Sequence, residues 1–105
     1  PSGTARSIAQ RVLERFPSKK SILYGMEDRA PRADELHVAC LRTGSNVGFH
    51  EVAFDGPGEV VKLSQQTRDR AAYARGSLLG AKWLARQERP GYYTFQDCLK
   101  EITGT

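Results

Sequence analysis

Two short turn segments divide the middle of the chain into three strand-like segments, and this division constrains the fold more than any other feature. The turns are Thr-Gly-Ser-Asn at 43–46 and Asp-Gly-Pro-Gly at 55–58, and the strand-like segments cover 36–42, 47–54 and 59–66. Segments of this length joined by short turns predict an antiparallel meander. Positions on both of its faces are apolar or small. We therefore expect one face to pack against a helix and the other to meet a partner subunit.

Helical periodicity lies on both sides of this meander. Residues 2–16 carry apolar side chains at intervals of three and four, with Ser2 or Thr4 as the N-cap and a proline directly after the last apolar residue. Residues 68–86 form the second helical pattern, whose apolar stripe contains Gly76 and Gly80. Glycine lowers helix propensity, so these two positions indicate that something packs closely against that stripe.

Two shorter elements complete the predicted fold. Residues 21–24 read as a short strand, and Thr94 with Asp97 three residues later reads as the capped start of a last helix that runs to Ile102. The fold class is therefore α+β. We expect an antiparallel or mixed four-stranded sheet packed with a long N-terminal helix, followed by two C-terminal helices. The segment 25–35 is rich in charge and lacks periodicity, a pattern typical of functional or mobile loops.

Composition excludes several classes of protein. Of the 105 residues, 39% are hydrophobic and 27% are charged, which is ordinary for a globular domain and argues against disorder and coiled coil. No apolar run approaches the roughly 18 residues that cross a bilayer, so we expect no membrane partner. Cys40 and Cys98 form neither a disulfide framework nor a metal motif, which favours a reducing cytoplasm. The formal net charge is +4, which suits an anionic ligand.

The start of the first helix has the features of an anion-binding site. Helical N–H groups in the first turn lack intrahelical partners, and the helix dipole places partial positive charge there. Gly3 allows a carboxylate or phosphate to approach the backbone, and the hydroxyl of Thr4 adds a donor. The same residues also fit an ordinary N-cap, and the pattern alone favours that interpretation.

The remaining candidate side chains, two histidines and the Arg-Asp-Arg segment, fit structural roles. His50 lies within a strand, His37 lies at a strand edge, and neither has a second ligand at metal-binding spacing. The segment 68–70 (Arg-Asp-Arg) fits a helix cap with solvated charges, or an arginine that organises a junction between domains. Basic residues do not alternate with aromatic ones in a stripe, so nucleic-acid binding has little support. No Gly-rich dinucleotide motif is present, and the residues form no complete catalytic set.

Several segments nevertheless resemble, in order, the C-terminal portion of the dihydrodipicolinate reductase (4-hydroxy-tetrahydrodipicolinate reductase) family. The family's catalytic segment reads His-His-x-x-Lys-x-Asp-Ala-Pro-Ser-Gly-Thr-Ala before a helix, and this chain opens with Pro-Ser-Gly-Thr-Ala before a predicted helix. Later hallmarks follow in the family's order: Arg42-Thr43-Gly44, Gly48-Phe49-His50, Gly58-Glu59, Asp69-Arg70 and Gly91-Tyr92-Tyr93. The chain departs from the family at Gln65 or Gln66, where a histidine is common.

This resemblance implies a function and a site. Members transfer a hydride from NADPH or NADH to a cyclic dicarboxylate in the lysine and diaminopimelate pathway, reducing 4-hydroxy-tetrahydrodipicolinate to tetrahydrodipicolinate, and they assemble as homotetramers. Gly3 and Thr4 match the pair that contacts the substrate, and we expect their N–H groups to hold one substrate carboxylate. The resemblance assigns residues 1–67 to substrate binding and oligomerisation. It assigns residues 68–105 to helices that return to a dinucleotide-binding domain.

The same resemblance places the proton-donating histidine and lysine upstream of Pro1, in a part that this sequence does not contain. The cofactor-binding domain is expected there too. We therefore expect this chain by itself to hold no catalytic residue, to bind no nicotinamide cofactor or metal, and to be inactive. The alternative function is that of a non-catalytic α+β module, either for oligomerisation or for binding nucleic acid through its basic residues.

Overall fold

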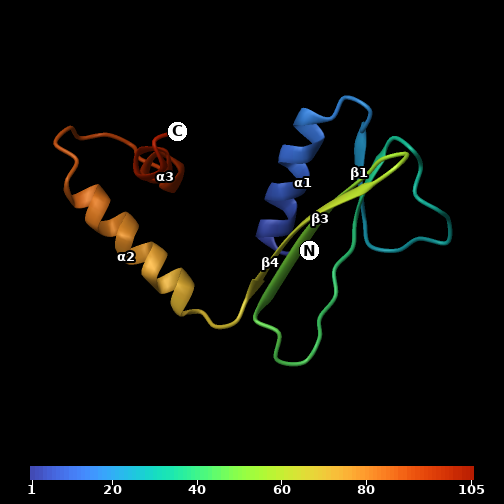
Figure 1. The fold of residues 1–105 in the computed structure, drawn as a ribbon, viewed down its shortest axis with the longest axis horizontal. Helices are drawn as coiled ribbons and strands as arrows, with labels where there is room; N and C mark the ends of the chain where they lie inside the picture. Colours follow the sequence, from blue (N-terminus) through green and yellow to red (C-terminus); the bar gives the residue numbers. More distant parts are fainter. The chain divides into compact units, whose positions relative to one another are not determined.

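A computed structural model describes all 105 residues, which form two compact units, Pro1–Asn46 and Val47–Thr105. The elements follow the order α1, β1, β2, β3, β4, α2 and α3 along the chain (Figure 1). The three helices and four strands confirm the α+β class. The predicted division at residue 67 concerns the roles of the two parts, and it stays a prediction.

The first unit is built on helix α1 and a small parallel sheet. Helix α1 spans Gly3–Arg15, with Ser2 as its N-cap and Phe16 as its C-cap, so the predicted helix is confirmed to within one residue at each end. At 13 residues it is of ordinary length rather than long. Strands β1 (Ser21–Tyr24) and β2 (Glu35–Val38) pair in parallel. Helix α1 contacts both strands, and Ala9 and Leu23 are the buried apolar residues of this unit.

The second unit begins with an antiparallel hairpin. Strands β3 (Gly48–Asp55) and β4 (Val60–Thr67) pair along their whole length, from Gly48 opposite Thr67 to Asp55 opposite Val60. The predicted turn at 55–58 is confirmed, because the N–H of Gly56 donates to the carbonyl of Glu59 at 2.8 Å. These two strands are the part of the predicted meander that the structure contains.

The first strand of the predicted meander does not pair with the second, although the sequence had predicted that pairing. Its pattern suggested residues 36–42 paired with 47–54, whereas β2 ends at Val38, pairs with β1 instead, and belongs to a separate two-stranded sheet. Residues 39–47 form no strand. The alternation at 36–42 gave no information on which neighbour provides hydrogen bonds. The loop 25–34 joins β1 to β2 as the crossover that a parallel pair requires.

Two helices complete the second unit. Helix α2 spans Ala71–Ala85, and α3 spans Phe95–Thr103 with Thr94 as its N-cap. The capping box predicted from Thr94 and Asp97 is confirmed in both directions, because each side chain accepts a hydrogen bond from the other residue's backbone N–H. Trp83 and Cys98 are buried, and Trp83 meets the ring of Tyr93 edge-on at 5.6 Å.

Candidate functional site

The start of α1 holds the two residues that sequence analysis assigned to substrate binding. Ser2 supplies the cap, since its hydroxyl accepts a hydrogen bond from the N–H of Ala5 at 3.1 Å and its carbonyl accepts one from the N–H of Arg6 at 3.1 Å. The N–H groups of Gly3 and Thr4 have no partner in the structure. Two donors at the positive end of the helix dipole are thus available to an anion.

These donors are exposed to solvent, and the first turn of α1 contains no acidic residue. Gly3 and Thr4 are exposed, and a Cβ built on Gly3 would meet no atom within 4 Å. The first turn contains no aspartate or glutamate that would repel an anion. The structure therefore places Gly3 and Thr4 together, as their adjacency requires, and Ser2 rather than Thr4 performs the capping role. The hydroxyl of Thr4 is accordingly not used in the cap.

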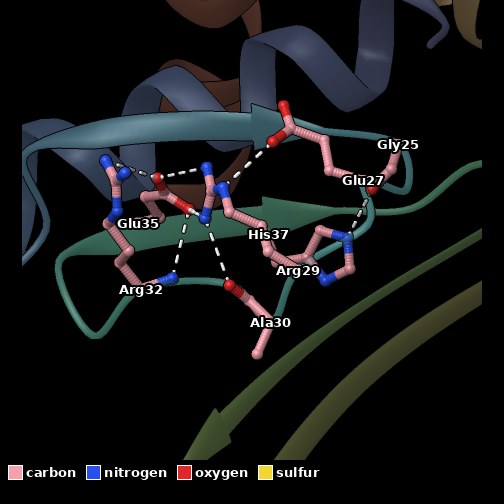
Figure 2. A network of polar contacts seen from close by, with 7 residues as sticks. All are labelled: Gly25, Glu27, Arg29, Ala30, Arg32, Glu35 and His37. Carbon is pink, nitrogen blue, oxygen red and sulfur yellow. Dashed lines mark hydrogen bonds and ion pairs between the residues drawn. The ribbon is translucent and has the colours of Figure 1, made fainter.

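The charged loop after β1 is held by one carboxylate (Figure 2). Glu35 at the start of β2 is only 8% exposed, and its two oxygens accept hydrogen bonds from the guanidinium of Arg29 at 2.8 and 3.0 Å. The backbone N–H of Arg32 donates to the same carboxylate at 3.1 Å. Arg29 also pairs with Glu27 at 3.0 Å. This bidentate arrangement fixes the loop against the strand that follows it.

Hydrogen bonding in this cluster shifts the pKa values of Glu35 and Arg29. The guanidinium of Arg29 and then the N–H of Arg32 lower the pKa of Glu35, and Glu35 in turn raises the pKa of Arg29. The composition of residues 25–35 indicated a functional or mobile loop, but it did not identify Glu35. No sequence signal identifies it, because Glu35 looked like one charge among several near the beginning of a strand.

The histidines take structural positions. The Nε2 atom of His37 lies 2.6 Å from the carbonyl oxygen of Gly25, so this side chain closes the far end of the same loop (Figure 2). In the hairpin, Nδ1 of His50 lies 3.5 Å from Oε1 of Gln65. Both arrangements agree with the structural interpretation. No group of three or more histidine, cysteine, aspartate or glutamate side chains is placed to hold a metal ion.

A chain of hydrogen bonds links the hairpin to α2. Nε2 of Gln65 donates to Oγ1 of Thr67 at 2.9 Å, and this hydroxyl lies 2.6 Å from the hydroxyl of Tyr73. Thr67 is 5% exposed. A Cβ on Gly48 would lie 3.3 Å from the Tyr73 hydroxyl, which explains the glycine at the start of β3. The sequence did not predict this contact, because nothing in the local pattern pairs the end of a strand with a tyrosine in the next helix.

The junction at 68–70 agrees with the capping interpretation. Oδ1 of Asp69 accepts a hydrogen bond from the N–H of Ala71 at 2.7 Å, while Arg70, the N-cap residue of α2, makes no side-chain cap. No contact in the structure gives Arg68 or Arg70 an organising role. None of the three helices combines the length and apolar character needed to cross a membrane.

These features together define an α+β domain that presents an uncapped pair of backbone donors at the start of its first helix. The sequence profile of the family described as "Dihydrodipicolinate reductase, C-terminus" matches residues 1–99. The chain therefore belongs to this family, and the resemblance seen in its motifs is confirmed.

Curated relatives agree with this membership. The chain is 41% identical over 100 residues to the 4-hydroxy-tetrahydrodipicolinate reductase of Aquifex aeolicus, covering 94% of this chain and 37% of the relative. It is 38% identical over 105 residues to the enzyme of that name from Caldanaerobacter subterraneus, covering 96% and 41%. The corresponding Archaeoglobus fulgidus protein is 36% identical over 104 residues, covering 95% and 40%. The chain thus spans about two fifths of the length of these relatives.

Proposed function

We propose that the protein to which this chain belongs reduces 4-hydroxy-tetrahydrodipicolinate to tetrahydrodipicolinate, in the lysine and diaminopimelate pathway, and that this chain supplies part of its substrate site. The observation that carries the proposal is the unpartnered pair of N–H donors at Gly3 and Thr4, in a chain that belongs to the reductase family. The matching relatives are named for this reaction.

The contribution of these residues is binding and orientation. A carboxylate of the cyclic dicarboxylate accepts hydrogen bonds from the N–H groups of Gly3 and Thr4, and the dipole of α1 stabilises its charge. The exposed hydroxyl of Thr4 supplies a third donor. NADPH or NADH supplies the hydride from the part of the protein outside these 105 residues. The role of the helix start is to hold the substrate in one orientation, which lowers the entropic part of the barrier.

The exposed apolar residues of the hairpin support self-association as part of the same proposal. Seven of the eight residues of β4 are exposed, including Val60, Val61 and Leu63, and Phe49 on β3 is half exposed. A two-stranded hairpin is at best marginally stable in water. We propose that a second copy covers these residues in a homo-oligomer, a tetramer in the family. We also assign the protein to the cytoplasm, since Cys40 and Cys98 are free thiols.

The kinetics of a Thr4→Val variant in the full-length protein test the substrate site. Valine keeps the shape of threonine but removes its hydroxyl donor, so kcat/KM for 4-hydroxy-tetrahydrodipicolinate should fall by roughly tenfold, with a rise in KM. Ser18→Ala removes an exposed hydroxyl just beyond the end of α1, and as the control it should leave both constants unchanged. If the Thr4→Val variant had the same kinetics as the unmodified full-length protein, Thr4 would not contact the substrate. Failure of the original protein to reduce this substrate would overturn the proposed reaction.

A further inference from the structure

A shallow groove lies between α1 and β1, apart from the donors at the helix start. Its lining residues are Arg6, Ser7, Gln10, Arg11 and Tyr24. The four helix residues occupy two adjacent rows of α1, since positions 6 and 10 and positions 7 and 11 are each one turn apart. The groove is open to solvent and has a volume of about 460 Å³. Tyr24, the last residue of β1, forms the aromatic part of its wall.

The charge of this groove is entirely positive. It is lined by two guanidinium groups and no carboxylate, and neither Arg6 nor Arg11 takes part in an ion pair. Ser7 and Gln10 add neutral polar groups between them. Two unpaired cations facing the same concave surface repel each other, and an anion that bridges them relieves this repulsion.

Arg6 contacts the aromatic wall of the groove. Its guanidinium carbon lies 4.9 Å from the centre of the Tyr24 ring, a cation–π contact. The guanidinium of Arg6 makes no ion pair, so its N–H groups remain free to donate to a ligand. A restrained arginine side chain loses less conformational entropy when it binds a ligand, so this contact should strengthen binding.

We propose that this groove binds a small anion carrying at least two negative charges, bridged between Arg6 and Arg11. Guanidinium groups bind phosphoryl and carboxylate oxygens with the same paired geometry, so both a diphosphate and a polycarboxylate have the required chemistry. Ser7 and Gln10 complete the hydrogen bonding. The site is separate from the donors at Gly3 and Thr4, and it does not depend on the proposed reaction.

Titration of the 105-residue protein with inorganic pyrophosphate and, separately, with citrate tests this site. Arginine side-chain Nε–H signals in NMR spectra, assigned with single variants, report on each guanidinium. We expect one of the two probes to bind saturably and to shift the signals of Arg6 and Arg11 with one shared dissociation constant. Tighter binding of pyrophosphate identifies a phosphoryl ligand, and tighter binding of citrate identifies a polycarboxylate; either result supports the site.

Matched variants separate the groove from general charge attraction. Arg11→Gln, on the exposed surface of α1, should weaken binding by about tenfold or more, since it removes a charge-assisted hydrogen bond. Arg15→Gln removes the same charge from the last turn of the same helix but lies outside the groove, and should change the affinity less than twofold. Tyr24→Leu should weaken binding through Arg6 alone. Equal losses in the Arg11 and Arg15 variants, or no saturable binding of either probe, would overturn the proposal.

Discussion

Gly80 of α2 lies directly beneath the aromatic ring of Phe95 in α3: a Cβ at this position would stand 3.1 Å from both Cδ2 and Cε2 of that ring. This distance is shorter than ordinary van der Waals contact. Gly76, one turn earlier, faces the same side chain with more room, because its Cβ would lie 3.9 Å from Cζ. The close packing that the glycine stripe indicated therefore has a partner within this chain, and the two glycines are not equivalent.

This difference predicts unequal stabilities for two alanine variants. Gly76→Ala should stabilise the protein by roughly 0.5–1 kcal/mol, because alanine favours the helix and meets only an ordinary contact. Gly80→Ala gains the same propensity but forces the Phe95 ring to move, so it should be less stable than Gly76→Ala by about 1 kcal/mol or more. Urea denaturation followed by the fluorescence of Trp83 measures both. Equal free energies of unfolding would show that the ring moves aside at no cost.

The carboxylate of Glu35 should make the protein sensitive to acid. Its pKa is lowered in the folded state, chiefly by its hydrogen bonds with Arg29, so its contribution to stability is present above the unfolded pKa of roughly 4.3. That contribution is lost as the pH falls through the lower folded pKa. Glu35→Gln should therefore flatten the dependence of stability on pH below about 4.3. Glu14→Gln removes an exposed carboxylate without an ion pair, and it should keep the original slope.

The hydroxyl of Tyr73 should contribute to the stability of the second unit. Tyr73→Phe removes the 2.6 Å hydrogen bond to the buried Thr67 and keeps the ring, so we expect a loss of about 1 kcal/mol. Thermal unfolding monitored by circular dichroism provides the measurement. Tyr92→Phe is the matched control, since Tyr92 is 93% exposed and makes no hydrogen bond through its side chain. A loss no larger than that of the control would show that the contact adds nothing.

The exposed hairpin should associate with itself if the proposed homo-oligomer is correct. Sedimentation at high micromolar concentration should then show a species larger than a monomer. Leu63→Lys places a charge on β4 at a position that is 66% exposed, and it should shift the protein toward monomer without unfolding it. Lys62→Leu, the adjacent position on the opposite face, tests whether both faces take part. A monomer at all concentrations would contradict association through this chain alone.

The 105-residue chain by itself should bind neither NADPH nor NADH. It contains no Gly-rich dinucleotide motif, and the resemblance assigns cofactor binding to a separate domain. Calorimetric titration with either cofactor should give no saturable heat, while the full-length protein should bind at least one of them. Saturable binding by the 105 residues would show that part of the cofactor site lies within them.

Local sequence determined most of the individual elements of this protein. Short-range rules were sufficient for α1 and α3, because a cap such as Ser2 or Thr94 and a 3.6-residue apolar period act within a few residues. The hairpin was equally local, since its turn brings neighbouring strands together. The free N–H donors at the start of α1 also followed from sequence, because they are a property of any helix start.

Tertiary structure decided what depends on partners distant in the sequence. The pairing of β2 with β1, rather than with the strand that follows it, depends on a crossover whose geometry the alternation of residues 36–42 does not encode. The bidentate contact of Arg29 with Glu35, the bond between Thr67 and Tyr73, and the approach of Gly80 to Phe95 each join side chains from different segments. Residue type and spacing show that such groups are able to interact, whereas only the folded backbone selects which of them meet.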